Sequence, residues 1–497
     1  MGKIQEQFFK KNLFSYSNES EKKNLCKFLE ANCSNHIKKY REFAENILQK
    51  KFSIFEKNYI FKDKINWHYS FFRNYNWPFK NSNEIEIRPK NVEVDVKYVW
   101  EFNRHQYFNY LGVLYFISGE EKYAIAFKNQ ILNWIRDNPP LIGVNWYSGL
   151  EISLRLTSWI FTLMLLYESK EINNNDFFQL IFKSMYQHAY YLKNFYLRRS
   201  FNHTVGELFG LYFFSKIFTG IKPFNRWERK FSKRLKNQII LQTRSDGVNI
   251  EQSLNYHRFV LEYFSLFSIL KPNLGKKEKR LIEKMYEYLL YMIKPNGSFP
   301  LIGDFDDGKV HILNFYEKDL YKQLINLGAI LFKRKDFKFA SDKLFPNNIL
   351  LTSLNHIRTF NELQPKKPKN FFKYFKNSGY FIIRNNWDEN ANYLFVDFGK
   401  FGPQTAAHSH SSITNFIFSY KGKDIIVDSG TYTYNKSWDK RNLFRSSKSH
   451  NVLTINDQNQ AKIVGWFAWK NKPRIRRKFE IKSDQFHLSC FHNGYNG

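Results

Sequence analysis

The stretch Gln364-Pro365-Lys366-Lys367-Pro368-Lys369 divides the chain into two kinds of sequence pattern. Its prolines and lysines are typical of an exposed connection between domains. Before it, from Asn18 to about Phe360, apolar residues recur at helical spacing, and breakers such as Asp137-Asn138-Pro139-Pro140 separate the repeats. We therefore expect successive antiparallel helix pairs, an arrangement that an α/α toroid (an incomplete barrel of helix pairs) accommodates. The predicted helices are Tyr107 to Ile117, Tyr123 to Arg136, Leu150 to Tyr167, Asp176 to Leu197, Val205 to Phe218, Arg226 to Gln242, Phe259 to Leu270 and Lys277 to Ile293.

After the connection the pattern changes to short runs of β-branched and aromatic residues, which are typical of antiparallel strands. We expect a multidomain α+β chain with a helical domain at 1–363 and a β-sandwich at 370–497. The last predicted strand ends close to Gly497, so the sandwich is expected to be truncated at its C-terminal side, with one edge uncovered. The predicted strands are Gly379 to Arg384, Tyr393 to Phe398, Thr414 to Tyr420, Asp424 to Val427, Asn451 to Ile455 and Phe486 to Phe491.

Charge is the strongest signal in the composition. Lysine and arginine outnumber aspartate and glutamate by 77 to 45, which gives a net charge of +32 in 497 residues. A field of that sign attracts polyanions such as nucleic acid, anionic lipid or acidic polysaccharide. The basic stretches are short and scattered, and no nucleic-acid-binding module is recognisable, so we expect no nucleic-acid partner. No apolar run approaches the roughly 18 residues of a membrane span.

The cysteines and the N-terminal segment bear on the compartment. Cys26, Cys33 and Cys490 form no CxxC pair and no disulfide framework, so we expect free thiols. The segment from Met1 to Tyr16 is polar and lacks the apolar region of a secretory signal, which favours the cytoplasm. The oligomeric state stays open.

Three ordered motifs in the second half bring together groups that bind metals and transfer protons: Ala407-His408-Ser409-His410, Val427-Asp428-Ser429-Gly430-Thr431 and Ser449-His450-Asn451. Two histidines at i and i+2 share one face of an extended strand, and Asp428 can return on a neighbouring strand. His410, Asp428 and His450 then form a ligand set suited to zinc, with His408 left free as a base. The alternatives are a polar outward strand face and a hydrogen-bonded His/Asp/His cluster without metal.

Together with motifs in the helical half, this pattern resembles the heparinase II/III superfamily of polysaccharide lyases, which includes alginate lyases. The resemblance covers nearly the whole chain, and the order and spacing of the motifs make it specific. The matching segments are Trp100 to Arg104, Asn145-Trp146 with Glu151 and Arg155, Asn202-His203, Asp246-Gly247, Glu251-Gln252-Ser253 with Tyr256-His257, Pro300 to Asp304 with Asp306-Asp307, the three motifs above, and His492 to Tyr495.

The resemblance implies cleavage of a uronic-acid-containing polysaccharide by β-elimination. A side-chain amide or imidazole stabilises the charge that develops on the uronate, and Asn202 with His203 supplies both groups. We assign His408 as the base and Tyr256 as the acid, and Tyr432 or Tyr434 can share the acid role. By resemblance the zinc is mainly structural, and the compartment is the periplasm or cell envelope.

Several residues within or beside these motifs are candidates for binding the substrate. Arginines can bind carboxylate or sulfate through two parallel hydrogen bonds. The candidates are Arg104, Trp146, Glu251, His257, Arg258 and Arg441, with Arg155 and Arg445 nearby. Their number favours a polyanion, but sulfated glycosaminoglycan, alginate and acidic bacterial exopolysaccharide all remain open.

Some of these residues, and the protein as a whole, have alternative interpretations. Asn202 can be a helix N-cap, and Asp304, Asp306 and Asp307 are interpreted as turn and scaffold acids. One rival function is a glycoside hydrolase that uses Glu251 and Asp304 as its two carboxylates. The other is a non-catalytic polyanion-binding protein that keeps the fold and the charge.

Overall fold

The computed structural model describes residues 2–10, 18–55, 57–70, 73–306, 308–310, 317–482 and 485–495. The chain forms two compact units. The first contains Met1–Asn237, Lys309–Phe315 and Leu344–Arg358, and the second contains Gln238–Gly308, Tyr316–Lys343 and Thr359–Gly497. The predicted boundaries at 363 and 370 stay a prediction.

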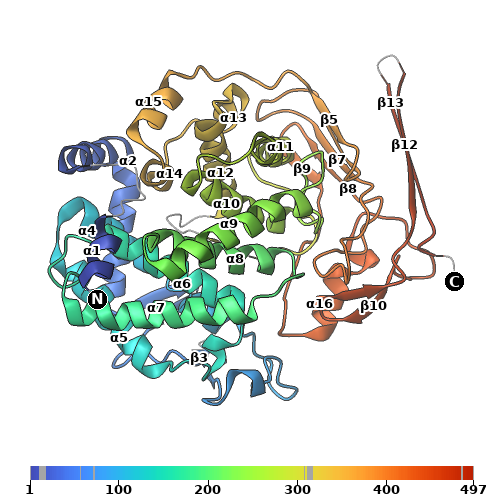
Figure 1. Ribbon diagram of the computed structural model, residues 1–497. Coiled ribbons are helices and arrows are strands. Elements are labelled where there is room, and N and C mark those ends of the chain that lie inside the picture. Colours follow the sequence, from blue (N-terminus) through green and yellow to red (C-terminus); the bar gives the residue numbers. More distant parts are fainter. Residues whose placement is uncertain are drawn as a thin grey trace. The chain divides into compact units, whose positions relative to one another are not determined.

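The first unit is mainly helical (Figure 1). Its helices are α1 (Gly2–Lys10), α2 (Glu19–Leu48), α3 (Lys97–Asn103), α4 (Phe108–Ser118), α5 (Glu121–Asp137), α6 (Gly149–Leu165), α7 (Asn175–Phe195), α8 (Asn202–Ile217), most of α9 (Lys222–Gln242), α14 (Pro346–Leu351) and the start of α15 (Leu354–Glu362). Two short hairpins and two 3₁₀ turns complete it: β1 (Lys51–Ile54) with β2 (Lys57–Ile60), β3 (Tyr69–Ser70) with β4 (Tyr75–Asn76), η1 (Ser82–Glu84) and η2 (Val144–Trp146).

Helix α6 lies at the centre of this unit. Every residue from Leu150 to Leu165 is buried, and the helix packs against α4, α7 and α8. A helix that is buried on all sides needs apolar residues around its whole circumference, and its polar residues need internal partners. Ser153 and Ser158 meet that need by donating to backbone carbonyl oxygens.

The second unit combines helices with an antiparallel sheet. Its helical elements are the end of α9, α10 (Leu254–Leu270), α11 (Lys276–Met292), α12 (Glu317–Phe332), α13 (Lys335–Ala340), the end of α15, α16 (Trp438–Arg445) and η3 (Ser447–Ser449). Its strands are β5 (Phe372–Phe375), β6 (Tyr380–Arg384), β7 (Tyr393–Asp397), β8 (Phe416–Tyr420), β9 (Lys423–Ile426), β10 (Lys462–Gly465), β11 (Ala468–Lys470), β12 (Ile475–Lys482) and β13 (Gln485–His492).

Strands β5 to β9 form one sheet in chain order, shown in orange in Figure 1. Phe395 in β7 pairs with Ile382 in β6 and Ile417 in β8. All three are buried, as the two-residue period of a strand requires for one core face. The β12–β13 hairpin contacts β5 and β6 through aromatic rings, such as Phe486 on Phe372 with centroids 4.7 Å apart.

Two predictions about strands are wrong. Residues 451–455 form no strand, because the Asn451 amide donates to the carbonyl oxygens of Phe416 and Val427 and so holds a loop against β8 and β9. His408 and His410 lie in a loop rather than on a strand, since Ser409 N donates to Ala406 O in a turn. Within the described ranges, no helix is long and apolar enough to cross a bilayer.

Candidate functional site

A phenol and an imidazole lie face to face in the second unit. The rings of Tyr256 and His408 have centroids 3.5 Å apart with an interplanar angle of 17°. Tyr256 lies in the first turn of α10, which Ser253 caps by accepting from Tyr256 N. The sequence places these two residues far apart, and the fold brings the predicted acid and the predicted base together.

Asp304 is the centre of the hydrogen-bonding network around His408. Its Oδ2 accepts from His408 Nδ1 at 3.0 Å, its Oδ1 accepts from His410 Nε2 at 3.0 Å, and Arg441 donates to both oxygens. The carboxylate has no exposed surface. Because a carboxylate can only accept, Nδ1 of His408 carries a proton, and in the neutral imidazole the lone pair therefore lies on Nε2. The sequence interpretation of Asp304 as a scaffold acid missed this role.

The backbone around Asp304 is tied to both neighbours. Asp304 N donates to His408 O at 2.9 Å, and Ser253 Oγ donates to Asp304 O at 2.7 Å. Gly303 has a φ of +64°, and a Cβ there would lie 2.6 Å from His408 O, so only glycine permits this approach. The Pro300 to Asp304 motif therefore joins the start of α10 to the His408 loop.

Local electrostatics set the protonation states of the site. Burial raises the pKa of Tyr256 well above its ordinary value, and Asp306 and Asp304 raise it further, so the phenol keeps its proton at neutral pH. Burial alone would raise the pKa of Asp304, but Arg441 and the bonds from His408 and His410 outweigh it and hold that pKa well below its usual range. Tyr256 is thus equipped to donate a proton, and Asp304 stays ionised.

Tyr434 and two acids surround the Tyr256–His408 pair. Tyr256 Oη lies 3.4 Å from both Tyr434 Oη and Asp306 Oδ2 and can donate its single proton to either. Glu251 Oε2 lies 3.7 Å from His408 Nε2. Asp307 lies outside the described residues. The glycoside-hydrolase alternative requires both carboxyl groups to reach the sugar, but the Asp304 carboxylate is fully buried and both of its oxygens are bonded to protein side chains.

The three predicted zinc ligands lie in the same unit. His450 Nδ1 donates to Asp428 Oδ2 at 2.8 Å, and the rings of His410 and His450 have centroids 5.1 Å apart. His410 Nδ1 and His450 Nε2 are buried and have no hydrogen-bond partner among the described residues. Among the residues that the structure describes, however, no three His, Cys, Asp or Glu side chains form a group that could hold a metal ion.

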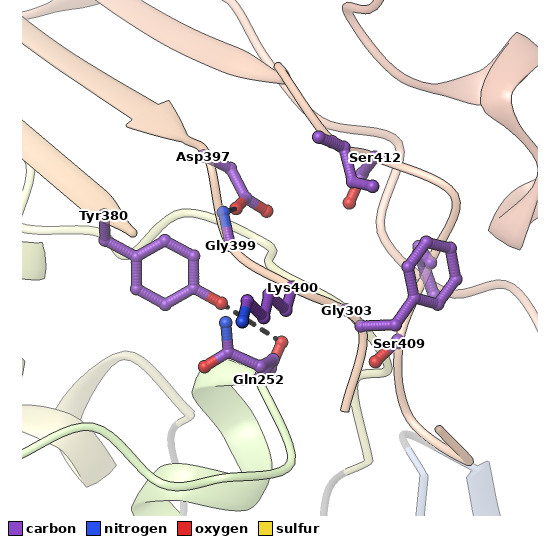
Figure 2. A pocket seen from close by; sticks show the side chains of 11 residues that line it. Gln252, Gly303, Tyr380, Asp397, Gly399, Lys400, Ser409 and Ser412 are labelled. Carbon is purple, nitrogen blue, oxygen red and sulfur yellow. Dashed lines mark hydrogen bonds between the residues drawn. The ribbon is translucent and has the colours of Figure 1, made fainter. Parts of the chain in front are cut away.

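A small polar cavity borders His410 (Figure 2). Gly399 N donates to Asp397 Oδ1 at 2.6 Å, and Tyr380 Oη donates to Gln252 O at 3.4 Å. Burial raises the pKa of Asp397 to about 7. The cavity volume is about 10 Å³, which is enough for roughly one water molecule and far too small for a sugar ring.

The predicted pair Asn202 and His203 lies in the first unit, at the start of α8. The preceding residue, Phe201, has a φ of +46°, a strained conformation of the kind that collects at functional sites. Asn202 is the first residue of the helix rather than its N-cap, so the N-cap interpretation is wrong. Asn202 is buried, whereas the His203 side chain is 38% exposed.

Glu207 is a buried acid one helical turn beyond His203. Its Oε2 accepts from Leu197 N at 2.5 Å, which anchors the loop that leads into α8. Its Oε1 lies 4.0 Å from His203 Nδ1. Burial raises the pKa of Tyr191, and the charge of Glu207 raises it further. Burial raises the pKa of Glu207 to about 7, although the Leu197 N–H acts in the opposite direction. The sequence analysis did not single out this residue.

The raised pKa of Glu207 predicts that the stability of the protein depends on pH. The unfolded chain ionises near the reference value of 4.5 and the folded chain near 7, so this contribution is fully present below pH 4.5 and is lost as pH rises through 7. The loss amounts to roughly 3 kcal/mol. Glu207→Gln should therefore raise the melting temperature at pH 8 relative to wild type and leave it nearly unchanged at pH 5. Equal differences at both pH values in calorimetry would contradict this.

Most of the predicted substrate-binding side chains are enclosed. Arg104 donates to both oxygens of Glu151 and also pairs with Glu101, and the Trp146 indole N–H donates to Asn138 O. Arg104 and Trp146 are 5% and 1% exposed. They have little surface to offer a ligand, and their substrate role stays a prediction.

The predicted substrate-binding side chains of the second unit are also enclosed. His257 is fully buried between Asn249 N and Met285 O, and burial lowers its pKa to about 3. Arg258 pairs with Glu262, and Arg441 with Asp304, and each guanidinium is 1% exposed. Among the predicted binding residues here, Glu251 is the one beside the Tyr256–His408 pair.

Comparison with known proteins gives matches over most of the chain. Residues 4–330 match the family described as heparinase II/III N-terminus, and residues 367–497 match heparinase II/III-like, C-terminal. The heparin-sulfate lyase of Bacteroides stercoris is 24% identical over 451 residues, which are 84% of this chain and 60% of that protein. A heparin-sulfate lyase of Bacteroides thetaiotaomicron is 24% identical over 403 residues, 76% of this chain and 54% of its own length.

Solved structures show the fold. A heparan sulfate lyase from Pedobacter heparinus matches with a TM-score of 0.60 at 21% identity, over 91% of this chain and 64% of that one. A structure of heparinase III matches with a TM-score of 0.64 at 18% identity, over 96% of this chain and 74% of that one. The predicted fold class, a helical region of the α/α-toroid type followed by an antiparallel β domain, is thereby confirmed. The chain belongs to the heparinase II/III family.

Proposed function

We propose that this protein is a polysaccharide lyase that cleaves a uronic-acid-containing polysaccharide by β-elimination. The observation that carries the proposal is the stacked Tyr256–His408 pair with His408 Nδ1 bonded to the buried Asp304 carboxylate. Family membership and the heparin-sulfate lyases among the relatives support it. A glycan resembling heparan sulfate is the first substrate to test.

The proposed reaction begins with removal of the proton at C5 of the uronate. His408 Nε2 carries the lone pair and takes that proton, while Asp304 stabilises the imidazolium that forms at Nδ1. The electron pair moves to form the C4–C5 double bond, and the C4–O bond breaks. Tyr256, whose pKa is raised by burial, gives its proton to the departing glycosidic oxygen, and Tyr434 at 3.4 Å can share that donation.

Neutralisation of the uronate carboxylate completes the proposed mechanism. Asn202 and His203 offer an amide and an imidazole, which stabilise developing negative charge as preorganised dipoles do. Glu207 supports this pair by anchoring Leu197 N in the loop before α8.

Zinc is part of the proposal as a structural ion. The buried nitrogens His410 Nδ1 and His450 Nε2, without partners among the described residues, fit imidazole ligation, whereas Asp428 accepts from the opposite ring nitrogen of His450 and would have to leave that bond to join the same ion. A bound ion would tie the His410 loop to the His450 turn and so fix the orientation of His408.

His450→Ala tests the zinc proposal. We expect the bound zinc, measured by elemental analysis of purified protein, to fall from about one per chain to near zero, with a melting temperature lower by several degrees. His487→Ala on β13 is the matched control, because that histidine is exposed. Equal zinc contents in wild type and in His450→Ala would remove the metal from the proposal.

The decisive experiment follows absorbance at about 232 nm, where the unsaturated uronate left by β-elimination absorbs. The panel contains heparan sulfate, hyaluronan, chondroitin, alginate and acidic bacterial exopolysaccharides. A rise on one glycan establishes lyase chemistry and names the substrate class. New reducing ends without that absorbance would identify a hydrolase, and neither signal with folded protein would favour a binding protein.

A further inference from the structure

Nearly all charged residues of helix α9 are positive. It carries seven lysines and arginines and a single acid, Glu228. Arg226, Arg229, Lys230 and Lys233 are all exposed and stand at positions i, i+3, i+4 and i+7, which share one helix face. We call these four residues the basic ridge. At 1.5 Å per residue it is about 10 Å long.

Aromatic rings of α7 lie beside the basic ridge. Trp227 of α9 is stacked on Tyr186, with centroids 6.3 Å apart and an interplanar angle of 16°. Tyr186 and Tyr190 are 37% and 50% exposed, and Lys193 Nζ lies 5.1 Å from the Trp227 ring. Aromatic side chains beside cations can bind an acidic polysaccharide. The aromatic rings pack against the faces of the sugars, and the cations pair with the negative groups of the sugars.

The C-terminal end of the basic ridge leads towards Asn202 within the same unit. Phe231 contacts Tyr196 at 6.5 Å, and the Arg234 guanidinium lies 5.4 Å from the Tyr196 ring. Tyr196 begins the short connection to α8, which carries the exposed Arg198 and Arg199. Cations therefore lie both on α9 and in the loop before Asn202, and Tyr196 at the start of that loop contacts α9.

We propose that the basic ridge, with its aromatic neighbours on α7, binds acidic glycan outside the reacting centre and anchors the uncleaved part of a long chain. The choice of glycan over another polyanion rests on the proposed function, whereas the binding itself is independent of turnover. Such binding releases counterions, so it weakens steeply as salt concentration rises.

The test compares two fourfold variants in binding to fluorescently labelled heparin at increasing NaCl. The ridge variant is Arg226→Gln, Arg229→Gln, Lys230→Gln and Lys233→Gln together. The matched control replaces the four exposed cations at the start of α11 with glutamine, namely Lys276, Lys277, Lys279 and Arg280. All eight side chains are exposed, so both proteins should fold, and circular dichroism checks this.

We expect the ridge variant to bind heparin about tenfold or more weakly at about 0.1 M NaCl, with a shallower dependence of log Kd on log salt. The control should change by less than about threefold. Tyr190→Ala should weaken the binding that persists at high salt. Equal losses in the ridge and control variants would overturn the proposal. It would also be overturned if the wild-type protein bound duplex DNA more tightly than heparin and the ridge variant lost both kinds of binding by the same factor.

The outcome is separable from that of the proposed function. A protein without lyase activity that loses heparin binding in the ridge variant still supports the anchoring surface. If the lyase is active, the ridge variant should raise KM for long chains and leave kcat on a short oligosaccharide unchanged. A kcat loss on the short substrate would instead assign these residues to the reaction and overturn the anchoring role.

Discussion

Replacing His408 by alanine, or Tyr256 by phenylalanine, is expected to lower kcat by about 10²–10⁴-fold, because each change removes one proton-transfer group from the stacked pair. Glycan affinity, measured by titration of the inactive proteins, should change little. The loss should therefore appear in kcat and not in KM. Normal turnover by both variants would refute the proposed mechanism.

Matched controls separate chemistry from general damage. His487→Ala removes an exposed imidazole on β13, and Tyr420→Phe removes a phenol that is 47% exposed at the end of β8. Both should keep wild-type kcat and melting temperature. Tyr434→Phe should lower kcat less than Tyr256→Phe does, since Tyr434 is the second phenol of the pair at 3.4 Å.

Asp304→Asn is expected to lower kcat by about 10²-fold or more, although Asp304 touches no reacting atom in the proposed mechanism. An asparagine can donate to His408 Nδ1, which would move the imidazole proton to Nε2, the nitrogen that must accept a proton. The change also leaves the buried Arg441 without its carboxylate, so stability should fall by roughly 3–5 kcal/mol in a denaturant titration.

A second variant distinguishes these two effects. Asp304→Asn combined with Arg441→Gln removes the unpaired buried charge, so part of the stability should return while kcat stays low. Asp424→Asn is the control, because that aspartate pairs with Lys294 and does not contact His408. Recovery of kcat together with stability in the double variant would make Asp304 a structural residue only.

Much of the fold was predictable because secondary structure follows from local periodicity. The helices at Leu150 to Tyr167 and Lys277 to Ile293 match α6 and α11 within two residues at each end. Helices α8 and α10 begin three and five residues earlier than predicted, because polar residues open them: Asn202 begins α8, and Ser253 caps α10 through its side chain. The strand predicted at 451–455 was lost to side-chain hydrogen bonds with residues 24 and 35 positions away.

The sequence by itself determined the helical and β halves, the family, and the list of groups capable of proton transfer, because these depend on local pattern and on ordered short motifs. Only the tertiary structure decided how those groups pair. Asp304 bonds to His408 and to Arg441, which are 104 and 137 positions away, so no local pattern distinguishes it from a turn acid. Burial is likewise set by long-range packing, which encloses His257 and Arg258 and leaves Tyr256 against His408.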